Sequence, residues 1–117
     1  MPTPSINRIQ IIGTVYQAPT KKQTKHAEYL EVLIKTVDSY VHNSVQKQEI
    51  EIHEVRVFGQ QARFLDDMIT TGDTVYCEGA LKSFDRKFYI SSKLARIIAK
   101  SNEAHPQASN VYPKRKI

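Results

Sequence analysis

The sequence predicts an all-β fold: a small closed barrel of five strands with one short helix between the third and fourth strands. Most of the chain consists of segments in which apolar residues alternate with polar ones, as in strands with one buried face. A single short segment carries apolar residues at helical spacing instead. Gly59 and Gly72 bracket that segment, so a strand–helix–strand unit organises the chain.

The size and composition are those of one small globular domain. The 117 residues leave room for a modest core, and the apolar fraction of 40% and charged fraction of 25% are ordinary. No apolar run approaches the roughly 18 residues of a membrane span, and the first residues lack the pattern of a secretory signal, so we expect neither membrane insertion nor export. Cys77 is the only cysteine, which fits a reducing compartment.

The net charge of +5 favours a polyanionic partner such as nucleic acid, although a solvated surface of mixed charge has the same balance.

Residues 1–100 are predicted to form the barrel. Residues 101–117 are rich in Asn, Ser, Gln, Pro and charge, and are expected to be a flexible basic tail.

The first strand is predicted over residues 7–16, with Ile9, Ile11 and Gly13 on one face. A glycine inside a strand indicates a bulge or a sharp bend, and small barrels need such bends to close. Residues 17–27 are polar and are expected to form a loop.

The second strand is predicted over residues 29–38, because Leu30, Val32 and Ile34 alternate with more polar positions. On the opposite parity, Tyr29, Leu33 and Val37 belong to a face that suits an oligomer interface. The residues numbered 38–48 are polar enough to form a protruding hairpin loop.

The third strand is predicted over residues 50–58, which are rich in β-branched and aromatic residues. If Val55 and Val57 face the core, Arg56 and Phe58 face outward together, as a ring beside a cation.

The helix is predicted from residue 60 to residue 69. Its buried stripe is expected to hold Ala62, Leu65, Met68 and Ile69, and residues 71–73 then form a turn.

The fourth strand is predicted over residues 74–81, with Val75, Cys77, Gly79 and Leu81 on the inner face. A turn at residues 83–87 leads to the fifth strand, whose alternation fails after Leu94. Five strands with a helix between the third and fourth is the element order of an OB-fold, which often binds single-stranded nucleic acid or sugars.

Three segments resemble the bacterial single-stranded DNA-binding proteins. They are residues 6–13 (INRIQIIG), residues 51–59 (EIHEVRVFG) and residues 72–81 (GDTVYCEGAL). The resemblance covers roughly residues 5–99. It implies an OB-fold that binds single-stranded DNA without sequence specificity during replication, recombination or repair. It also implies a homotetramer acting in the bacterial cytoplasm, associated with the nucleoid or a plasmid.

The resemblance implies that bases stack on aromatic rings while Lys and Arg hold the phosphates. Ile52 falls where the family usually has a stacking Trp, and the chain has no Trp at all, so Tyr and Phe must supply the rings. The expected binding residues are the rings Tyr40, Phe58, Phe84 and Phe88, and the cations Arg8, Lys21, Lys22, Lys35, Arg56, Lys82 and Lys87.

The C-terminus departs from the family, whose usual tail is acidic and recruits replication and repair enzymes. This chain ends in the basic run from Lys114 to Lys116, so we do not expect those partners by that route. The start of the chain also resembles the primosomal replication protein of the same fold, which lacks the acidic tail and implies a homodimer. A third interpretation is an OB-fold protein-interaction module that binds nucleic acid weakly.

Nothing in the sequence indicates an enzyme. The four histidines are scattered without metal-ligand spacing, and no phosphate-binding glycine loop or nucleophile elbow is present. We therefore expect no catalytic residues, no metal and no cofactor.

Overall fold

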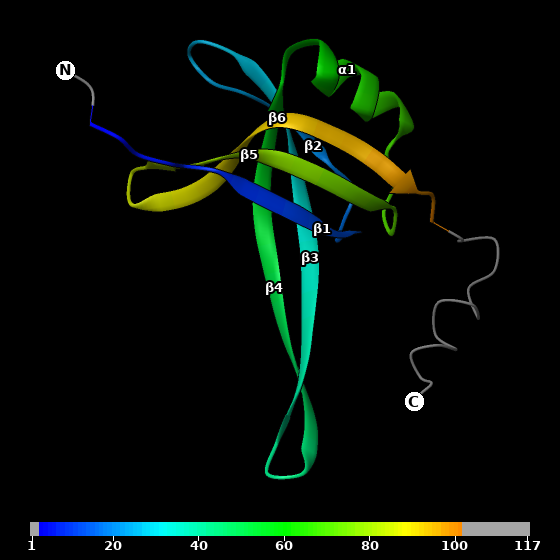
Figure 1. Ribbon diagram of the computed structural model, residues 1–117. Coiled ribbons are helices and arrows are strands. Elements are labelled where there is room, and N and C mark those ends of the chain that lie inside the picture. The colour runs from blue at the N-terminus through cyan, green and yellow to red at the C-terminus, as the bar shows by residue number, and fades with distance from the viewer. Residues whose placement is uncertain (1–2, 102–117) are drawn as a thin grey trace.

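The computed structural model describes residues 3–101 as six strands and one helix (Figure 1). In chain order these are β1 (Ile9–Val15), β2 (Thr20–Gln23), β3 (Glu28–His42), β4 (Val45–Phe58), α1 (Gly59–Met68), β5 (Thr74–Phe84) and β6 (Lys87–Ala99). The expected basic tail, apart from Ser101, lies outside the described residues. Among the described residues, no helix is long and apolar enough to cross a membrane.

The sheet closes into the predicted barrel. Its strand order is β1-β5-β6-β4-β3-β2, and β1 also pairs with β3 through Thr14↔Lys35 and Val15↔Ile34. Five strands therefore form the closed barrel, and α1 lies between the third and fourth of them, as the sequence predicts. The all-β, five-stranded OB-fold is confirmed.

Short strand β2 corrects the expectation that residues 17–27 form only a loop. It pairs antiparallel with the start of β3, from Thr20↔Glu31 to Gln23↔Glu28. All of its residues are exposed, so this edge strand has no apolar face that a sequence pattern would reveal.

Gly13 marks the point where the barrel closes. It pairs with Val75 of β5, and the next residue, Thr14, already pairs with Lys35 of β3. A Cβ atom at this position would overlap the carbonyl oxygen of Lys35 and the Ile34 side chain. The predicted bend is therefore a close crossing of two backbones, which only glycine permits here.

The region expected to be a hairpin loop, residues 38–48, is instead a continuous two-stranded arm (Figure 1). The β3–β4 ladder runs without a break from Tyr29↔Phe58 to His42↔Val45. Asn43 and Ser44, both at positive φ, form the tight turn. Both faces of the arm beyond the barrel are exposed, so alternating burial leaves no mark on its sequence.

The core consists of inward-facing aliphatic residues from the barrel strands and α1. Its most buried members include Leu30, Val32, Ile34, Val55, Val57 and Val75. Because Val55 and Val57 are inside, Arg56 and Phe58 lie on the outer face, as expected. Two predictions of inward packing are wrong: Met68 at the end of α1 and Leu81 beyond the core are 47% and 42% exposed.

A bulge explains the lost alternation in the last strand. Glu78 pairs with Leu94, but the neighbouring Gly79 pairs with Ser92, so Lys93 is the extra residue. As a result, the buried side chain before the bulge is at an even-numbered position, Ile90, and the one after it is at an odd-numbered position, Ala95.

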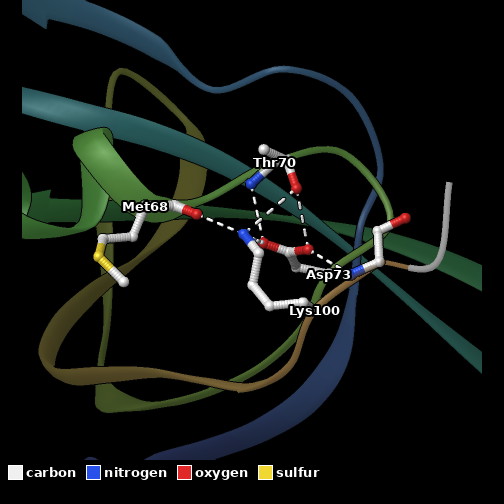
Figure 2. Close-up of polar contacts among 5 residues, drawn as sticks. Met68, Thr70, Asp73 and Lys100 are labelled. Atoms are coloured by element: carbon white, nitrogen blue, oxygen red, sulfur yellow. Dashed lines mark hydrogen bonds and ion pairs between the residues drawn. The ribbon is translucent and has the colours of Figure 1, made fainter. Parts of the chain in front are cut away.

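The end of the barrel next to α1 is held by Asp73, which is fully buried. Its carboxylate accepts hydrogen bonds from Thr70 N (2.8 Å) and Oγ1 (2.9 Å), Lys100 Nζ (2.8 Å) and Ser101 N (2.6 Å) (Figure 2). Lys100 also donates to the carbonyl of Met68. Burial alone would raise the pKa of Asp73, but these hydrogen bonds outweigh it and hold the pKa below its ordinary value.

Candidate nucleic-acid interface

A strip of stacked side chains crosses the outer face of strands β3, β4 and β6. The rings of Phe58 and Tyr29 lie with centroids 5.4 Å apart, tilted by 45°. The Arg56 guanidinium carbon lies 4.7 Å from the centre of the Tyr29 ring and 3.8 Å from that of Tyr89. We call these four residues the stacking strip. Its rings and its cation are the two components that non-specific single-strand binding uses.

The strand register assembles this strip. Tyr29 pairs with Phe58 on neighbouring strands, so their side chains share one face. Arg56 pairs with Ser91 across the parallel β4–β6 contact, which puts Tyr89, two residues before Ser91, on the same face. The guanidinium of Arg56 therefore reaches rings from the strands on both sides of its own.

Arg56 is tied to Glu54 on the same strand. Its Nε donates a hydrogen bond of 2.7 Å to Glu54 Oε2, and both side chains are partly exposed. Burial by itself would lower the pKa of Arg56, but the hydrogen bond and the charge of Glu54 outweigh it, so the pKa lies above its ordinary value. Arg56 is thus a permanent cation in a fixed orientation.

The β5–β6 hairpin continues the outer face of the strip. Lys82 pairs with Tyr89, and Phe84 lies two residues further along β5 on the same face. The Phe84 ring is 73% exposed at the hairpin end, where Asp85 and Arg86 form a turn at positive φ. Phe84 and Lys82 therefore extend the surface that begins at Phe58.

Phe88 lies on the opposite face of this hairpin from Phe84, because it pairs with Ser83. It lines an apolar opening of about 370 Å³ together with Ile9, Ile11, Leu81 and two residues of the outer face, Ile52 and Tyr89. The structure thus separates two of the expected binding rings. By strand parity Phe84 shares the face of the strip, whereas Phe88 points to the other face and borders the strip only at this opening.

Tyr40 is exposed but lies away from the strip. It pairs with Lys47 on the protruding arm. The side chains of this pair lie on the opposite face of the β3–β4 ladder from those of Lys35 and Ile52. Lys35 and Ile52 belong to the parity of Arg56, so they continue the outer face toward the arm. The 41% exposed Ile52 offers an aliphatic side chain where a stacking ring would be usual in the resembling family.

Lys21 and Lys22 lie on exposed strand β2, at the edge of a cleft of about 860 Å³ beside Phe58 and Tyr29. Each already has an acidic partner: Lys21 lies 3.3 Å from Asp66 on α1, and Lys22 lies 3.7 Å from Glu31. These surface pairs are weak, so both lysines remain available to phosphates.

Arg8 lies apart from the strip, just before β1. The outer face of β1 and β5 carries a network in which Tyr76 donates to Glu78 Oε2 (2.7 Å) and Gln10 Nε2 donates to Tyr76 (2.9 Å). The hydrogen bond from Tyr76, followed by that from Gln10, lowers the pKa of Glu78, and Arg8 adds a smaller attraction. Lys87 is exposed at the start of β6.

Sequence reasoning missed Tyr89 and gave Tyr29 another role, although both belong to the strip. Tyr29 is only 8% exposed because Arg56 and Phe58 cover it. One signal in the sequence pointed to Tyr89. It is next to the inward-facing Ile90 in a strand, so its side chain must face outward, as that of Arg56 does between Val55 and Val57. What the sequence lacks is the strand pairing that brings β6 beside β4.

The described residues contain no cluster of His, Cys, Asp and Glu arranged to hold a metal ion. Cys77 is buried in the core, and burial raises its pKa to about 12, so its thiol is not a nucleophile at neutral pH.

Three solved structures that are similar to this fold are of single-stranded DNA-binding proteins. One from Thermus aquaticus, a deletion mutant, is 20% identical with a TM-score of 0.67; the match covers 80% of this chain and 50% of that one, so this chain spans half of its length. A Plasmodium falciparum protein in complex with single-stranded DNA is 21% identical with a TM-score of 0.66, covering 85% and 98%. A small protein from Streptomyces coelicolor is 15% identical with a TM-score of 0.60, covering 77% and 92%.

The family comparison covers most of the chain. Residues 6–100 match the Single-strand binding protein family, a range that includes the whole barrel and every residue of the stacking strip. The three segments that carry the resemblance lie within it. The chain therefore belongs to the Single-strand binding protein family.

Proposed function

We propose that this protein binds single-stranded DNA without sequence specificity and protects it during replication, recombination or repair. The observation that carries the proposal is the stacking strip, in which the Phe58 and Tyr29 rings adjoin a guanidinium that lies over Tyr89. Stacking on aromatic rings contributes about 1–3 kcal/mol per base and tolerates every base, because each has a π-face. This explains affinity without base-specific hydrogen bonds.

The proposed phosphate contacts come from cations around the strip. Lys82 and Lys35 share its face, and Lys21 and Lys22 lie along the adjoining cleft. Lys87 adds charge at the hairpin, and Arg8 at the start of β1. Tyr40 and Phe88 lie off this face, so in the proposal they contact DNA only where the strand leaves the strip.

A titration with fluorescently labelled oligonucleotides tests the proposal. The protein should bind oligo-dT well above a duplex of equal length, because only unpaired bases can stack on the rings. The affinity should fall as salt rises, since phosphate contacts release counterions. Equal binding of single strand and duplex would refute the proposal.

The assembly is proposed to be a homotetramer, with a dimer as the alternative. On the outer face of β3, the 47% exposed Val37 and the half-buried Leu33 offer apolar surface for such contacts. Sedimentation equilibrium distinguishes the two states by mass.

We further propose that the protein has no enzymatic activity and acts where DNA is unwound in the bacterial cytoplasm. Oligonucleotides incubated with the protein should remain unchanged, which checks the proposed lack of enzymatic activity.

A further inference from the structure

Strand β2 leaves one edge of the sheet open. It is the last strand in the order β1-β5-β6-β4-β3-β2, whereas β1, at the other end of that order, is joined to β3 where the barrel closes. All four residues of β2 are exposed, and within the described sheet β2 pairs with β3 alone. An open edge can take up a further strand, because its unpaired backbone groups offer hydrogen bonds to an extended chain.

The turn after β2 shows which backbone groups face this edge. Thr24 N donates to Ala27 O at 2.7 Å, so these two residues form a hydrogen-bonded pair that continues the β2–β3 register. Hydrogen-bonded and non-hydrogen-bonded pairs alternate along antiparallel strands. The even-numbered residues of β2 therefore bond to β3, and the N–H and C=O groups of Lys21 and Gln23 point away from it.

Strand β1 shows how such outward groups are satisfied elsewhere on this side of β3. The N–H of Val15 donates to Asp73 O, and its C=O accepts from Gly72 N, both at 2.9 Å. Among residues 3–101, no backbone hydrogen bond outside the strand ladders uses Lys21 or Gln23. Each of these two residues therefore keeps one donor and one acceptor for a partner.

The charge of the edge favours an acidic partner. Residues 20–25 (TKKQTK) hold three lysines and no acidic residue. Pairing of this edge with that of a second copy would set lysines against lysines, which is unfavourable. Lys21 and Lys22 already contact Asp66 and Glu31, but these surface ion pairs are weak, so a partner's carboxylates can replace them at little cost.

The cleft of about 860 Å³ between β2 and α1 accommodates the other face of an added strand. Lys21 lies on this face, since it reaches Asp66 of α1. Leu30 and Ala62 give the cleft apolar walls, while Asp66 and Asp67 disfavour further carboxylates there. Because successive side chains of a strand point to opposite faces, a segment in which acidic and apolar residues alternate fits both faces.

We propose that the open edge of β2 binds an extended acidic segment of a partner protein as an added strand. Its backbone bonds to Lys21 and Gln23, its carboxylates lie beside Lys22, and its apolar side chains lie over the cleft. This goes beyond the proposed function, because the ligand is a protein and is bound without DNA. The segment also competes with DNA for the two lysines of β2.

A short fluorescent peptide of alternating Glu and Val serves as the probe, with the same peptide carrying Lys in place of Glu as its control. Anisotropy should reach saturation with the acidic peptide and not with the basic one. N-methylation of every backbone amide keeps the charge but removes the donors, so the methylated acidic peptide should bind at least about tenfold more weakly. Equal binding of the methylated peptide, equal binding of the basic peptide, or no binding of the acidic peptide overturns the inference.

Gln23→Pro tests the edge from the side of the protein. Proline removes the N–H that faces the open edge and leaves the ladder to β3 intact, a placement that edge strands tolerate. The acidic peptide should bind about tenfold more weakly to this variant. Gln23→Ala is the matched control, because it keeps the N–H and should bind the peptide like the wild type. Thermal melting confirms that both variants fold.

Two further measurements on Gln23→Pro distinguish the other possible occupants of the edge. Its oligo-dT affinity and its sedimentation should both equal those of the wild type. A weaker oligo-dT complex would assign the edge to DNA, and a smaller assembly would assign it to a second copy. Either result overturns the inference, as does unchanged binding of the acidic peptide. A wild type that binds this peptide but does not prefer single-stranded DNA overturns the proposed function and leaves the inference standing.

Discussion

Phe58→Ala is the most direct test of the stacking strip. The ring lies partly exposed at the end of β4, on the outer face and beside Gly59, where the chain turns into α1. Among the described residues, its ring packs against that of Tyr29, with the centroids 5.4 Å apart. Truncation removes the ring that a base would stack on while the buried Val57 next to it is untouched.

The expected loss of affinity is about 1–3 kcal/mol, the contribution of one stacked base, which corresponds to about a 5- to 150-fold weaker complex. The loss of the Phe58–Tyr29 contact should also lower the free energy of unfolding by about 0.5–1.5 kcal/mol. The folding effect is small, so the variant stays folded at room temperature and its affinity is measurable.

Fluorescence anisotropy with labelled oligo-dT at fixed salt measures this change. Phe64→Ala is the matched control, since Phe64 is a 66% exposed ring on α1, outside the strip. The salt slope should be unaltered in both variants, because neither removes a charge. If the folded Phe58→Ala variant bound like the wild type, Phe58 would be a purely structural residue and the strip would not be the binding surface.

Four further predictions concern stability, reactivity and the tail. Asp73→Asn should lower the free energy of unfolding by about 1–3 kcal/mol at pH 7. Because the folded-state pKa of Asp73 is depressed, the wild type, but not the variant, should lose this stability as the pH falls below about 4. A difference in urea midpoint between wild type and variant that is the same at pH 7 and pH 3 would contradict this. Gly13→Ala should cost about 1–3 kcal/mol in a thermal melt through the overlap with Lys35, and an unchanged melting temperature would show that the crossing relaxes. Cys77 should resist iodoacetamide at pH 8 until guanidinium unfolds the chain, since burial raises its pKa to about 12, and rapid native labelling would argue against its burial. Deleting residues 102–117, which include three basic residues near the end, should reduce the salt slope slightly, and an identical slope would exclude a contribution from the tail.

The fold is predictable because burial imposes a period on the sequence. Val55 and Val57 alternate with Arg56 and Phe58, and that alternation alone places two residues of the stacking strip on the outer face. The same logic fails where burial does not alternate. The arm between Val37 and Ile50 is exposed on both faces, so its ladder looks like a polar loop in the sequence.

The candidate site is less predictable than the fold because it depends on pairing between distant strands. Lys93, the bulged residue, shifts the parity of β6, so the alternation around Ile90 cannot be extended to Ala95 from the sequence alone. The parallel pairing of Arg56 with Ser91, which brings Tyr89 beside the guanidinium, is likewise invisible in either segment. Tyr40 and Phe88, the rings that the sequence offered by local position, are off the face of the strip because they share the parity of the inward-facing Ile34 and Ile90 on their own strands.

The strip also accounts for how this chain does without tryptophan. Ile52 leaves an aliphatic side chain where a large ring would be usual, and a tyrosine or phenylalanine by itself presents a smaller stacking surface than an indole. Here Phe58, Tyr29, the Arg56 guanidinium and Tyr89 adjoin one another, so the strip spans three strands, with the Phe58 and Tyr29 rings tilted by 45° to each other. A guanidinium plane stacks on bases as well as on tyrosine, and unlike a ring it carries charge. We therefore expect Arg56 to add to the salt dependence of the oligo-dT titration, by at most about 0.7 in the slope of log affinity against log salt.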